Sequence, residues 1–495
     1  MTIREVLKNN LFYLAILVLT IISYFTHVHN YQNPKGFFWD ENYHVPAAMK
    51  YLNNVFFREY HPPLGKLLIA LGEYGYQTIT GENQNVDIQP LLTTAYAKDI
   101  PDDFKFNGVR FFPVVFAWAS VIVFFLILHV ILQNTALAFA FSSLYAFENS
   151  IIVHFRGAML DGIQMFFILL AILFFIRYSR LKEITAINFF CMGTCIGLSL
   201  ATKVTGLVLV VLFPFLLYRV NSSFDYWLSR EGVKHVICLA LSSFAGIMMP
   251  FLLVWYVHFA LGDHAADEQW YKASPEVQQI IKERKQASPI NFYEQLIDTY
   301  RFFVQNNKGV PKLDVCKPGE NGSTPFKWII GGKSINYRWA KDGKGATRYL
   351  FLQVNPLILF ISILALALSI ILVGGRLFFG LPLKDADSFY FILPMLSIYL
   401  AYMGMMLNIE RVMYLYHYFI PYMCTFVIAA CLFKYIYSEY IQKADTFLYS
   451  VLALCYFGVF TVFLYYSPLT YYSPLRSQAV MARELFKEWQ LKPIL

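Results

Sequence analysis

The sequence predicts an all-α polytopic membrane protein with about eleven transmembrane helices and two large extracytoplasmic loops. Hydrophobic residues make up 58% of the 495-residue chain and charged residues only 15%, whereas soluble domains carry about 25% charged residues. The apolar residues form long runs, and residues 111–132 and 356–373 contain no charged side chain. A helix needs about 20 apolar residues to cross a bilayer, so these runs are expected to lie in lipid.

The first apolar run, residues 11–25, is predicted to be an uncleaved signal anchor. It follows Arg4 and Lys8, as the hydrophobic part of a signal peptide does, but no convincing small-x-small cleavage site comes after it. Because basic residues stay on the cytoplasmic side, Arg4 and Lys8 place the N-terminus in the cytoplasm. Residues 28–107 then form the first extracytoplasmic loop.

Ten further apolar segments complete the predicted bundle, and the pair within 186–218 is the hardest to delimit. They cover residues 109–132, 135–153, 159–177, 186–202, 204–218, 235–260, 355–374, 388–407, 412–433 and 446–466.

Threading the chain through these segments places most short basic loops in the cytoplasm, as expected for a multi-pass protein. Residues 261–354 become a second extracytoplasmic loop, and the tail from Ser467 is also outside. The expected organisation is an N-terminal membrane module (1–260) with the first loop inside it, the second loop, and a C-terminal four-helix membrane module (355–495). The stretches 275–285 and 290–304 have helical apolar spacing, which suits surface helices or ordinary packing under a lid.

Composition also excludes several classes of function. The net charge of +8 is modest and its basic residues are scattered, so nucleic acid is not an expected partner. Six of the seven cysteines lie in hydrophobic segments, which argues against an external disulfide framework. The sequence contains no CxxC pair of the metal-binding type, and no metal site is predicted.

Asp40 and Glu41 are the first candidate catalytic residues. They are adjacent carboxylates in an aromatic stretch, directly after the first predicted span. Partial desolvation by the aromatic rings would suit a carboxylate that acts as a general base. The alternatives are a solvated acidic loop and aromatic residues that only anchor the helix at the interface.

The stretch HPPLGK at residues 61–66 places His61 and Lys66 at one stiff corner of the first loop. This corner is a candidate substrate loop. It can equally be a rigid turn that leads into a short interfacial helix at residues 67–76, and the two interpretations are compatible.

Four cations fall at predicted outer ends of spans and form a candidate site for an anionic headgroup: Arg110, Arg156, Lys203 and Arg411. Charges beside hydrocarbon are costly, so they pair with one another or bind a ligand, and guanidinium groups match phosphate oxygens. In the alternative interpretation Glu148, Asp161 and Glu410 neutralise these cations internally.

Two further patterns are expected to carry no function. Asp385 and Asp387 have the spacing of a metal-chelating DxD, but the predicted topology places them in a short cytoplasmic loop, away from the other candidates. The tripeptides that begin at Asn221 and Asn321 match the glycosylation sequon, a pattern that recurs by chance.

Several stretches together resemble the protein O-mannosyltransferases, and they occur in the same order over residues 38 to about 425. The stretches are Asp40-Glu41, HPPLGK at 61–66, RGAMLD at 156–161, GLSLATKVTG at 197–206, Asn355-Pro356 and RVMYLYHY at 411–418.

The resemblance implies a membrane-embedded GT-C glycosyltransferase with a polyprenyl-phosphate sugar, usually mannose, as donor and Ser or Thr hydroxyls of translocated proteins as acceptors. It implies that Asp40 and Glu41 are the catalytic acidic pair and that the active site is extracytoplasmic. No cofactor is required, and a metal is not demanded because fixed cations can stabilise the leaving phosphate. The implied donor phosphate and sugar site comprises Arg110, Arg156, Asp161, Lys203, Arg411 and His417.

Residues 261–354 are too few for the β-trefoil domain that eukaryotic members carry in this loop. The chain therefore looks similar to the bacterial branch, which implies a bacterial inner membrane, or the endoplasmic reticulum for a shortened eukaryotic paralogue. The alternatives are a related transferase that modifies lipid A or another glycolipid, and a flippase or transporter. A transporter is expected to place its ionisable residues near the bilayer midplane, whereas here they gather at the outer ends of spans.

Overall fold

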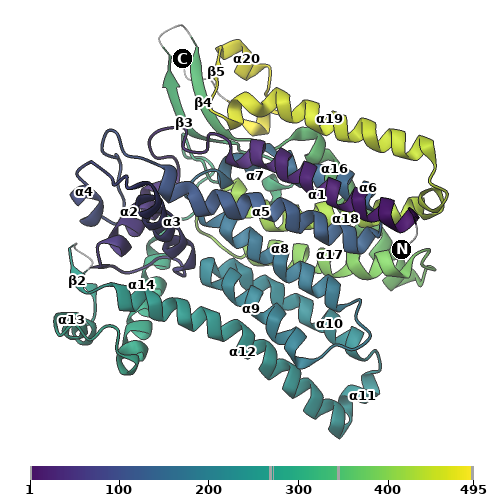
Figure 1. Ribbon diagram of the computed structural model, residues 1–495, viewed down its shortest axis with the longest axis horizontal. Helices are drawn as coiled ribbons and strands as arrows, with labels where there is room; N and C mark the ends of the chain where they lie inside the picture. Colours follow the sequence, from purple (N-terminus) through teal and green to yellow (C-terminus); the bar gives the residue numbers. More distant parts are fainter. Residues whose placement is uncertain (1–2, 267–269, 271, 343–345, 492–495) are drawn as a thin grey trace.

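The protein is a long helical bundle whose two loops meet at one end. The computed structural model describes residues 3–266, 270, 272–342 and 346–491. Figure 1 shows the first loop, with α2–α4, and the neighbouring elements β2, α13 and α14 at the end of the bundle opposite the N-terminus. The two segments predicted to be extracytoplasmic therefore lie on the same face.

The N-terminal half contains the first loop and the longest helix. Its elements are α1 (Ile3–Ser23), the π-helix η1 (Tyr24–Val28), α2 (Glu41–Leu52), β1 (Val55–Phe56), α3 (Leu64–Thr80), α4 (Gln89–Leu92), α5 (Asn107–Leu132), α6 (Thr135–Ala146), α7 (Asn149–Phe155), α8 (Leu160–Tyr178), α9 (Ala186–Thr202), the 3₁₀-helix η2 (Val204–Val211), α10 (Leu212–Val220), α11 (Phe224–Leu228) and α12 (Arg230–Leu261).

The C-terminal half contains the second loop and the last four long helices. Its elements are β2 (His264–Ala265), α13 (Pro275–Lys282), η4 (Pro289–Asn291), α14 (Phe292–Gly309), α15 (Pro325–Trp328), β3 (Ile335–Lys341), β4 (Thr347–Leu352), α16 (Pro356–Phe379), α17 (Ala386–Leu407), η5 (Leu415–Tyr418), α18 (Phe419–Gln442), α19 (Thr446–Thr470), β5 (Pro474–Leu475), α20 (Ser477–Met481) and η6 (Lys487–Trp489).

Eight helices among the described residues are long and apolar enough to cross a membrane, and a ninth candidate is the pair α6 and α7, which bends by 63°. The other two predicted spans correspond to shorter apolar helices, α9 and the segment Val204–Val220. The second of these begins as a 3₁₀-helix, which is short by nature because its hydrogen bonds are poorer than those of an α-helix. The structure confirms a multi-span helical membrane protein with eight or nine candidate spans.

The bend between α6 and α7 is fastened by the buried carboxylate of Glu148. It accepts hydrogen bonds from the Ser150 hydroxyl at 2.8 Å, the Asn355 backbone N–H at 3.0 Å and the Tyr422 hydroxyl at 3.1 Å. Asn355 in turn caps α16, and Pro356 stands at its first position, where the missing N–H costs nothing. The Asn355-Pro356 motif therefore ties three helices together inside the bundle, and Glu148 does not neutralise a cation.

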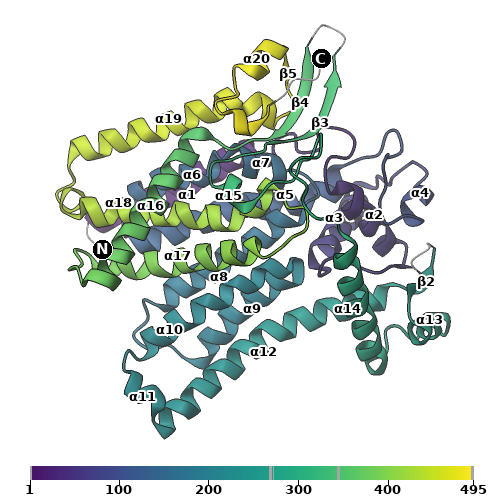
Figure 2. The same cartoon turned by 180° about the vertical axis from the view of Figure 1, so that it is seen from behind.

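The loops contain short strands that the sequence analysis did not predict. β1 in the first loop pairs in parallel with β2 in the second. β3 and β4 form an antiparallel hairpin, and β5 from the C-terminal tail adds to β4. Figure 2 shows this three-stranded sheet above the loop end of the bundle, beside α20. The predicted surface stretches 275–285 and 290–304 are helical as α13 and α14, and the predicted helix 67–76 lies within α3.

Candidate active site

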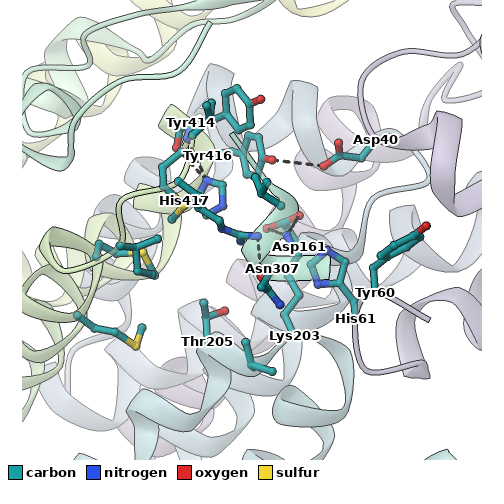
Figure 3. A pocket seen from close by; sticks show the side chains of 18 of the residues that line it. Asp40, Tyr60, His61, Asp161, Lys203, Thr205, Asn307, Tyr414, Tyr416 and His417 are labelled. Carbon is teal, nitrogen blue, oxygen red and sulfur yellow. Dashed lines mark hydrogen bonds and ion pairs between the residues drawn. The ribbon is translucent and has the colours of Figure 1, made fainter. Parts of the chain in front are cut away.

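A cavity of about 1020 Å³ opens where the two loops meet the bundle. The first loop, α8, η2, α14 and the segment before α18 all contribute side chains to its wall. Figure 3 shows Asp40 on one side of this cavity, opposite Tyr414 and His417, with Asp161, Lys203 and His61 nearby. Seven of the ten residues expected at the site line this cavity: Asp40, His61, Lys66, Asp161, Lys203, Arg411 and His417.

Asp40 presents its carboxylate to the cavity. It stands at the N-cap of α2 but makes no side-chain capping bond, and the Tyr416 hydroxyl donates to it at 3.3 Å. Trp39, just before it, has a φ of 51°, a left-handed conformation that costs energy for a bulky residue. The rings of Tyr337 and Tyr414 pack on Trp39 at 5.1 and 4.9 Å and hold that backbone in place.

Burial raises the pKa of Asp40, and the positive charge of Lys203 only partly offsets this effect. A raised pKa makes the carboxylate a stronger base, provided that the pH is high enough to keep it ionised.

Glu41, the other member of the acidic pair, has a structural role. Its side chain is fully buried, and Arg110 binds it through two N–H groups at 2.7 and 2.8 Å. The backbone N–H groups of Phe38 and Ala158 also donate to it. A side chain at Gly157 would come within 2.5 Å of the Phe38 ring, so only glycine allows this approach. Glu41 therefore fixes the loop instead of facing the cavity.

The prediction that four cations meet at one place is wrong for Arg110 and Arg156. Arg110 donates to Glu41 and to the carbonyls of Gln32, Pro34 and Gly36. Neither arginine lines the cavity. Guanidinium groups carry five donors, and in Arg110 nearly all of them are used within the protein.

Arg156 binds the backbone that follows the first helix, a few residues before the carbonyls that Arg110 binds. It donates to the carbonyls of His27, His29 and Asn30 at 2.9–3.0 Å, and its guanidinium packs on the Tyr471 ring. Together, the two arginines hold the chain that leads from the first helix to Asp40.

Lys203 and Asp161 form an ion pair in the cavity wall. The Lys203 ammonium lies 2.8 Å from both carboxylate oxygens. The imidazole of His154 contacts the same carboxylate at 3.1 Å, and its other nitrogen lies 2.7 Å from the Tyr337 hydroxyl. If Tyr337 donates to this nitrogen, the neutral imidazole donates to Asp161. The Asp161 carboxylate therefore neutralises Lys203 within the protein, as the alternative interpretation of the cations proposed.

Arg411 lines the cavity and has no carboxylate partner among the described residues. Its guanidinium donates to the side-chain oxygen of Asn307 at 3.2 Å. Glu410, the expected neutralising acid, forms an ion pair with Lys312 instead. His417 lies beside Arg411 in the wall, stacked on Tyr416 with ring centroids 4.5 Å apart.

His61 and Lys66 occupy the corner that HPPLGK predicts, but in different ways. His61 faces the cavity, and burial together with the positive charges of Lys203 and Lys66 lowers its pKa well below the usual value. It is therefore a neutral donor and acceptor. Lys66 is buried in an ion pair with Glu59, so its charge is compensated although part of it lines the cavity.

The wall nearest the candidate spans is apolar and rich in methionine. It includes Met165, Ile168, Val204, Met405, Met406, Ile409, Met413, Phe419 and Ile420. Methionine side chains are flexible and adapt to irregular apolar ligands. The cavity thus combines a polar end and an apolar side.

The two patterns that were expected to lack function do not contribute to the cavity. Asp385 caps α17, and Asp387 forms ion pairs with Arg180 and Lys434. Asn221 and Asn321 are not part of the cavity wall. Across the described residues, His, Cys, Asp and Glu side chains form no cluster of three suited to a metal ion, and the expectation that no metal is required stays a prediction.

The sequence analysis missed Tyr337, Asn307 and the direct contact of Tyr416 with Asp40. Tyr337 lies on β3, and the alternation of apolar and polar residues along the stretch 335–339 was the signal for this strand. Nothing in the sequence indicated that the strand reaches His154.

The chain is similar to known proteins over most of its length. The family model "Dolichyl-phosphate-mannose-protein mannosyltransferase" matches residues 17–262, and "C-terminal four TMM region of protein-O-mannosyltransferase" matches residues 292–489. Protein O-mannosyl-transferase 2 of Danio rerio is 28% identical over 261 residues, which are 50% of this chain and 32% of that protein. Dolichyl-phosphate-mannose–protein mannosyltransferase 5 of Saccharomyces cerevisiae is 29% identical over 161 residues, 32% of this chain and 20% of that protein.

The match therefore spans about a third or less of each of these two relatives. Among solved structures, the S. cerevisiae protein O-mannosyltransferase Pmt1-Pmt2 complex bound to the sugar donor has a similar chain, with a TM-score of 0.78. The similarity covers 97% of this chain and 92% of the other at 14% identity, so it establishes a shared fold.

Proposed function

The chain belongs to the dolichyl-phosphate-mannose–protein mannosyltransferase family, and on that premise we propose that it transfers mannose from a polyprenyl phosphate to Ser or Thr hydroxyls of translocated proteins. The observation that carries this proposal is the arrangement within one cavity. A carboxylate, Asp40, lines the same cavity as Lys203 and Arg411, together with several methionine and other apolar side chains. A lipid-linked sugar needs both a cationic site for its phosphate and an apolar surface for its chain.

In the proposed reaction the acceptor hydroxyl oxygen attacks the anomeric carbon while its proton passes to Asp40. The bond from that carbon to the phosphate oxygen breaks, and the electron pair stays on the phosphate. Arg411 and Lys203 stabilise the charge that grows there. The single displacement inverts the anomeric configuration. Arg110, Arg156 and Glu41 act as positioning residues, because they hold the segment that ends in Asp40.

The topology that goes with this function has eleven crossings. The nine candidate spans, together with α9 and the segment Val204–Val220, make eleven. A cytoplasmic N-terminus then places both large loops and the cavity outside, where lipid-linked sugars replace nucleotide-sugars as donors. A bacterial inner membrane is the proposed location.

A reconstituted assay tests the proposal. Purified protein in vesicles receives polyprenyl-phosphate mannose and either a Ser/Thr peptide or lipid A, and mass spectrometry identifies the mannosylated product. We expect mannosyl peptide. Transfer to lipid A alone would favour the glycolipid alternative and reject the proposed acceptor.

Replacing Arg411 with alanine should raise the KM for the lipid-phosphate donor about 10–100-fold. Hydrogen bonds to charged groups contribute about 1.5–3 kcal/mol, and no described carboxylate pairs with Arg411, whose guanidinium donates to Asn307. The peptide KM should change little. Lys98→Ala, which alters an exposed cation of the first loop, is the matched control. An unchanged donor KM in Arg411→Ala would remove this residue from the phosphate site.

On the acid side of the pH profile, kcat should fall at a higher pH than it would for an ordinary aspartate, whose pKa is about 3.9. Asp40 must be ionised to accept a proton, and burial raises its pKa, so protonation stops the reaction at a higher pH than usual. Full activity at pH 4 would contradict this assignment of the base. Transfer rates at saturating donor and peptide, measured from pH 4 to 8, provide the test.

A further inference from the structure

Three tyrosine rings gather beside the cavity that contains Asp40: Tyr43 and Tyr60 line it, and Tyr96 packs against Tyr43. The ring centroids of Tyr43 and Tyr96 are 4.8 Å apart, and those of Tyr43 and Tyr60 are 6.3 Å apart. Tyr43 is 40% exposed and Tyr96 is 45% exposed. Large aromatic side chains left open beside a reactive group suit the binding of a partner.

The tyrosine cluster is held in place from three directions. Tyr43 follows Asp40 by one helical turn on α2. The segment that carries Tyr96 is fastened to the start of α2, because the Ala97 N–H donates to the Asn42 carbonyl at 3.0 Å. Tyr60 packs against Phe302 of α14 with ring centroids 5.3 Å apart. Rings that are already ordered lose little entropy when a ligand binds.

Two tyrosines of the cluster also border a second, small hollow of about 10 Å³, the size of about one water molecule. Tyr43 and Tyr60 line both hollows, and Thr94 and Ala95 form part of the smaller one. Tyr43 and Tyr60 therefore lie between the main cavity and this small hollow. The pKa of Tyr43 is raised by burial and by the charge of Asp40, which agrees with their closeness.

The charges beside the cluster indicate which acceptor it fits. Arg58 forms an ion pair with Asp298 at 3.0 Å, and Lys66 pairs with Glu59. Lys50 is buried against the Phe57 ring. These three cations are already engaged, and the exposed Lys98 near Tyr96 is a single charge, so the described residues beside the cluster do not form the group of free cations that suits the phosphates of a lipid A acceptor. The three tyrosines also lie outside the candidate spans, where an extended polypeptide can reach them.

We propose that Tyr43, Tyr60 and Tyr96 form the acceptor shelf, a surface that binds an extended, uncharged stretch of polypeptide next to the Ser or Thr that receives the sugar. This inference rests on the proposed function. Tyrosine rings contact peptide groups and side chains over a large area at low entropic cost. The shelf holds the polypeptide so that its hydroxyl points toward Asp40, while the donor occupies the cationic and apolar walls.

Kinetics and direct binding together test the shelf. Reconstituted wild-type protein, Tyr43→Ala and Tyr96→Ala are compared with a neutral Ser/Thr peptide and polyprenyl-phosphate mannose. Truncation of an aromatic contact commonly costs about tenfold in affinity. We therefore expect about a tenfold higher peptide KM, a matching loss of affinity for a fluorescent peptide in anisotropy measurements, and an unchanged donor KM.

Tyr43→Phe and Tyr96→Phe keep the ring and should retain the wild-type peptide KM within about twofold. Tyr74→Ala, which removes an exposed tyrosine from α3, is the matched control and should behave as wild type. Unchanged peptide binding in both alanine variants would overturn the shelf, and so would an equal rise in peptide and donor KM. Peptide binding that depends on Tyr43 and Tyr96 without any sugar transfer would support the shelf and overturn the proposed function.

Discussion

Replacing Asp40 with asparagine should reduce kcat for sugar transfer about 10²–10⁴-fold, the usual contribution of a general base. Asparagine has nearly the same shape and can still accept the hydrogen bond from Tyr416, but it cannot take up the acceptor's proton. The KM values for donor and peptide should therefore stay close to those of the wild type. Initial rates of mannosyl-peptide formation by the reconstituted protein measure this effect.

The matched control for Asp40→Asn is Asp99→Asn, the same change at an exposed aspartate of the first loop. It should keep wild-type turnover. Asp40→Glu retains the acid group and should recover part of the lost rate. Near-normal turnover of Asp40→Asn would show that another group accepts the proton.

Breaking the buried pair of Glu41 and Arg110 should give the largest loss of stability. Glu41→Gln leaves the Arg110 guanidinium buried without its counter-charge, a change that costs about 3–5 kcal/mol in free energy of unfolding. Arg110→Gln likewise leaves the Glu41 carboxylate buried without its counter-charge. The unfolding temperature of the detergent-solubilised protein, followed by intrinsic fluorescence, should fall clearly in both variants.

Two further variants make this prediction specific. Replacing both residues at once, Glu41→Gln with Arg110→Gln, removes both charges and should cost less than the sum of the single changes. Glu82→Gln breaks the solvent-exposed pair with Lys105 and should leave the unfolding temperature unchanged, because exposed pairs contribute little. Strictly additive losses at Glu41 and Arg110 would contradict a coupled buried pair.

The membrane architecture was predictable because it depends on run length and loop charge. Both quantities can be read along the chain, and nearly every predicted span is a helix at the expected place. The bend between α6 and α7 was not predictable. It depends on Glu148 meeting Asn355 and Tyr422, which are far away in the sequence.

The candidate site was predictable only in part, because residue type and membrane depth do not reveal which partner a charge meets. Asp40, Lys203, Asp161 and Arg411 do share one cavity. Arg110 and Arg156 have the same chemistry at a similar depth, yet Arg110 binds Glu41 and loop carbonyls, and Arg156 binds carbonyls at the start of the first loop. The acceptor shelf combines three distant tyrosines, and only the folded loops bring them together.

The central claim is that this protein adds mannose to proteins outside the cytoplasm through Asp40. Intact-glycopeptide mass spectrometry tests it most directly, in cells that lack the protein and produce either the wild-type chain or Asp40→Asn at equal levels. We expect hexose on Ser and Thr of exported proteins with the wild-type chain and its loss with Asp40→Asn. Identical glycopeptides in both strains would show that this protein does not mannosylate exported proteins through Asp40.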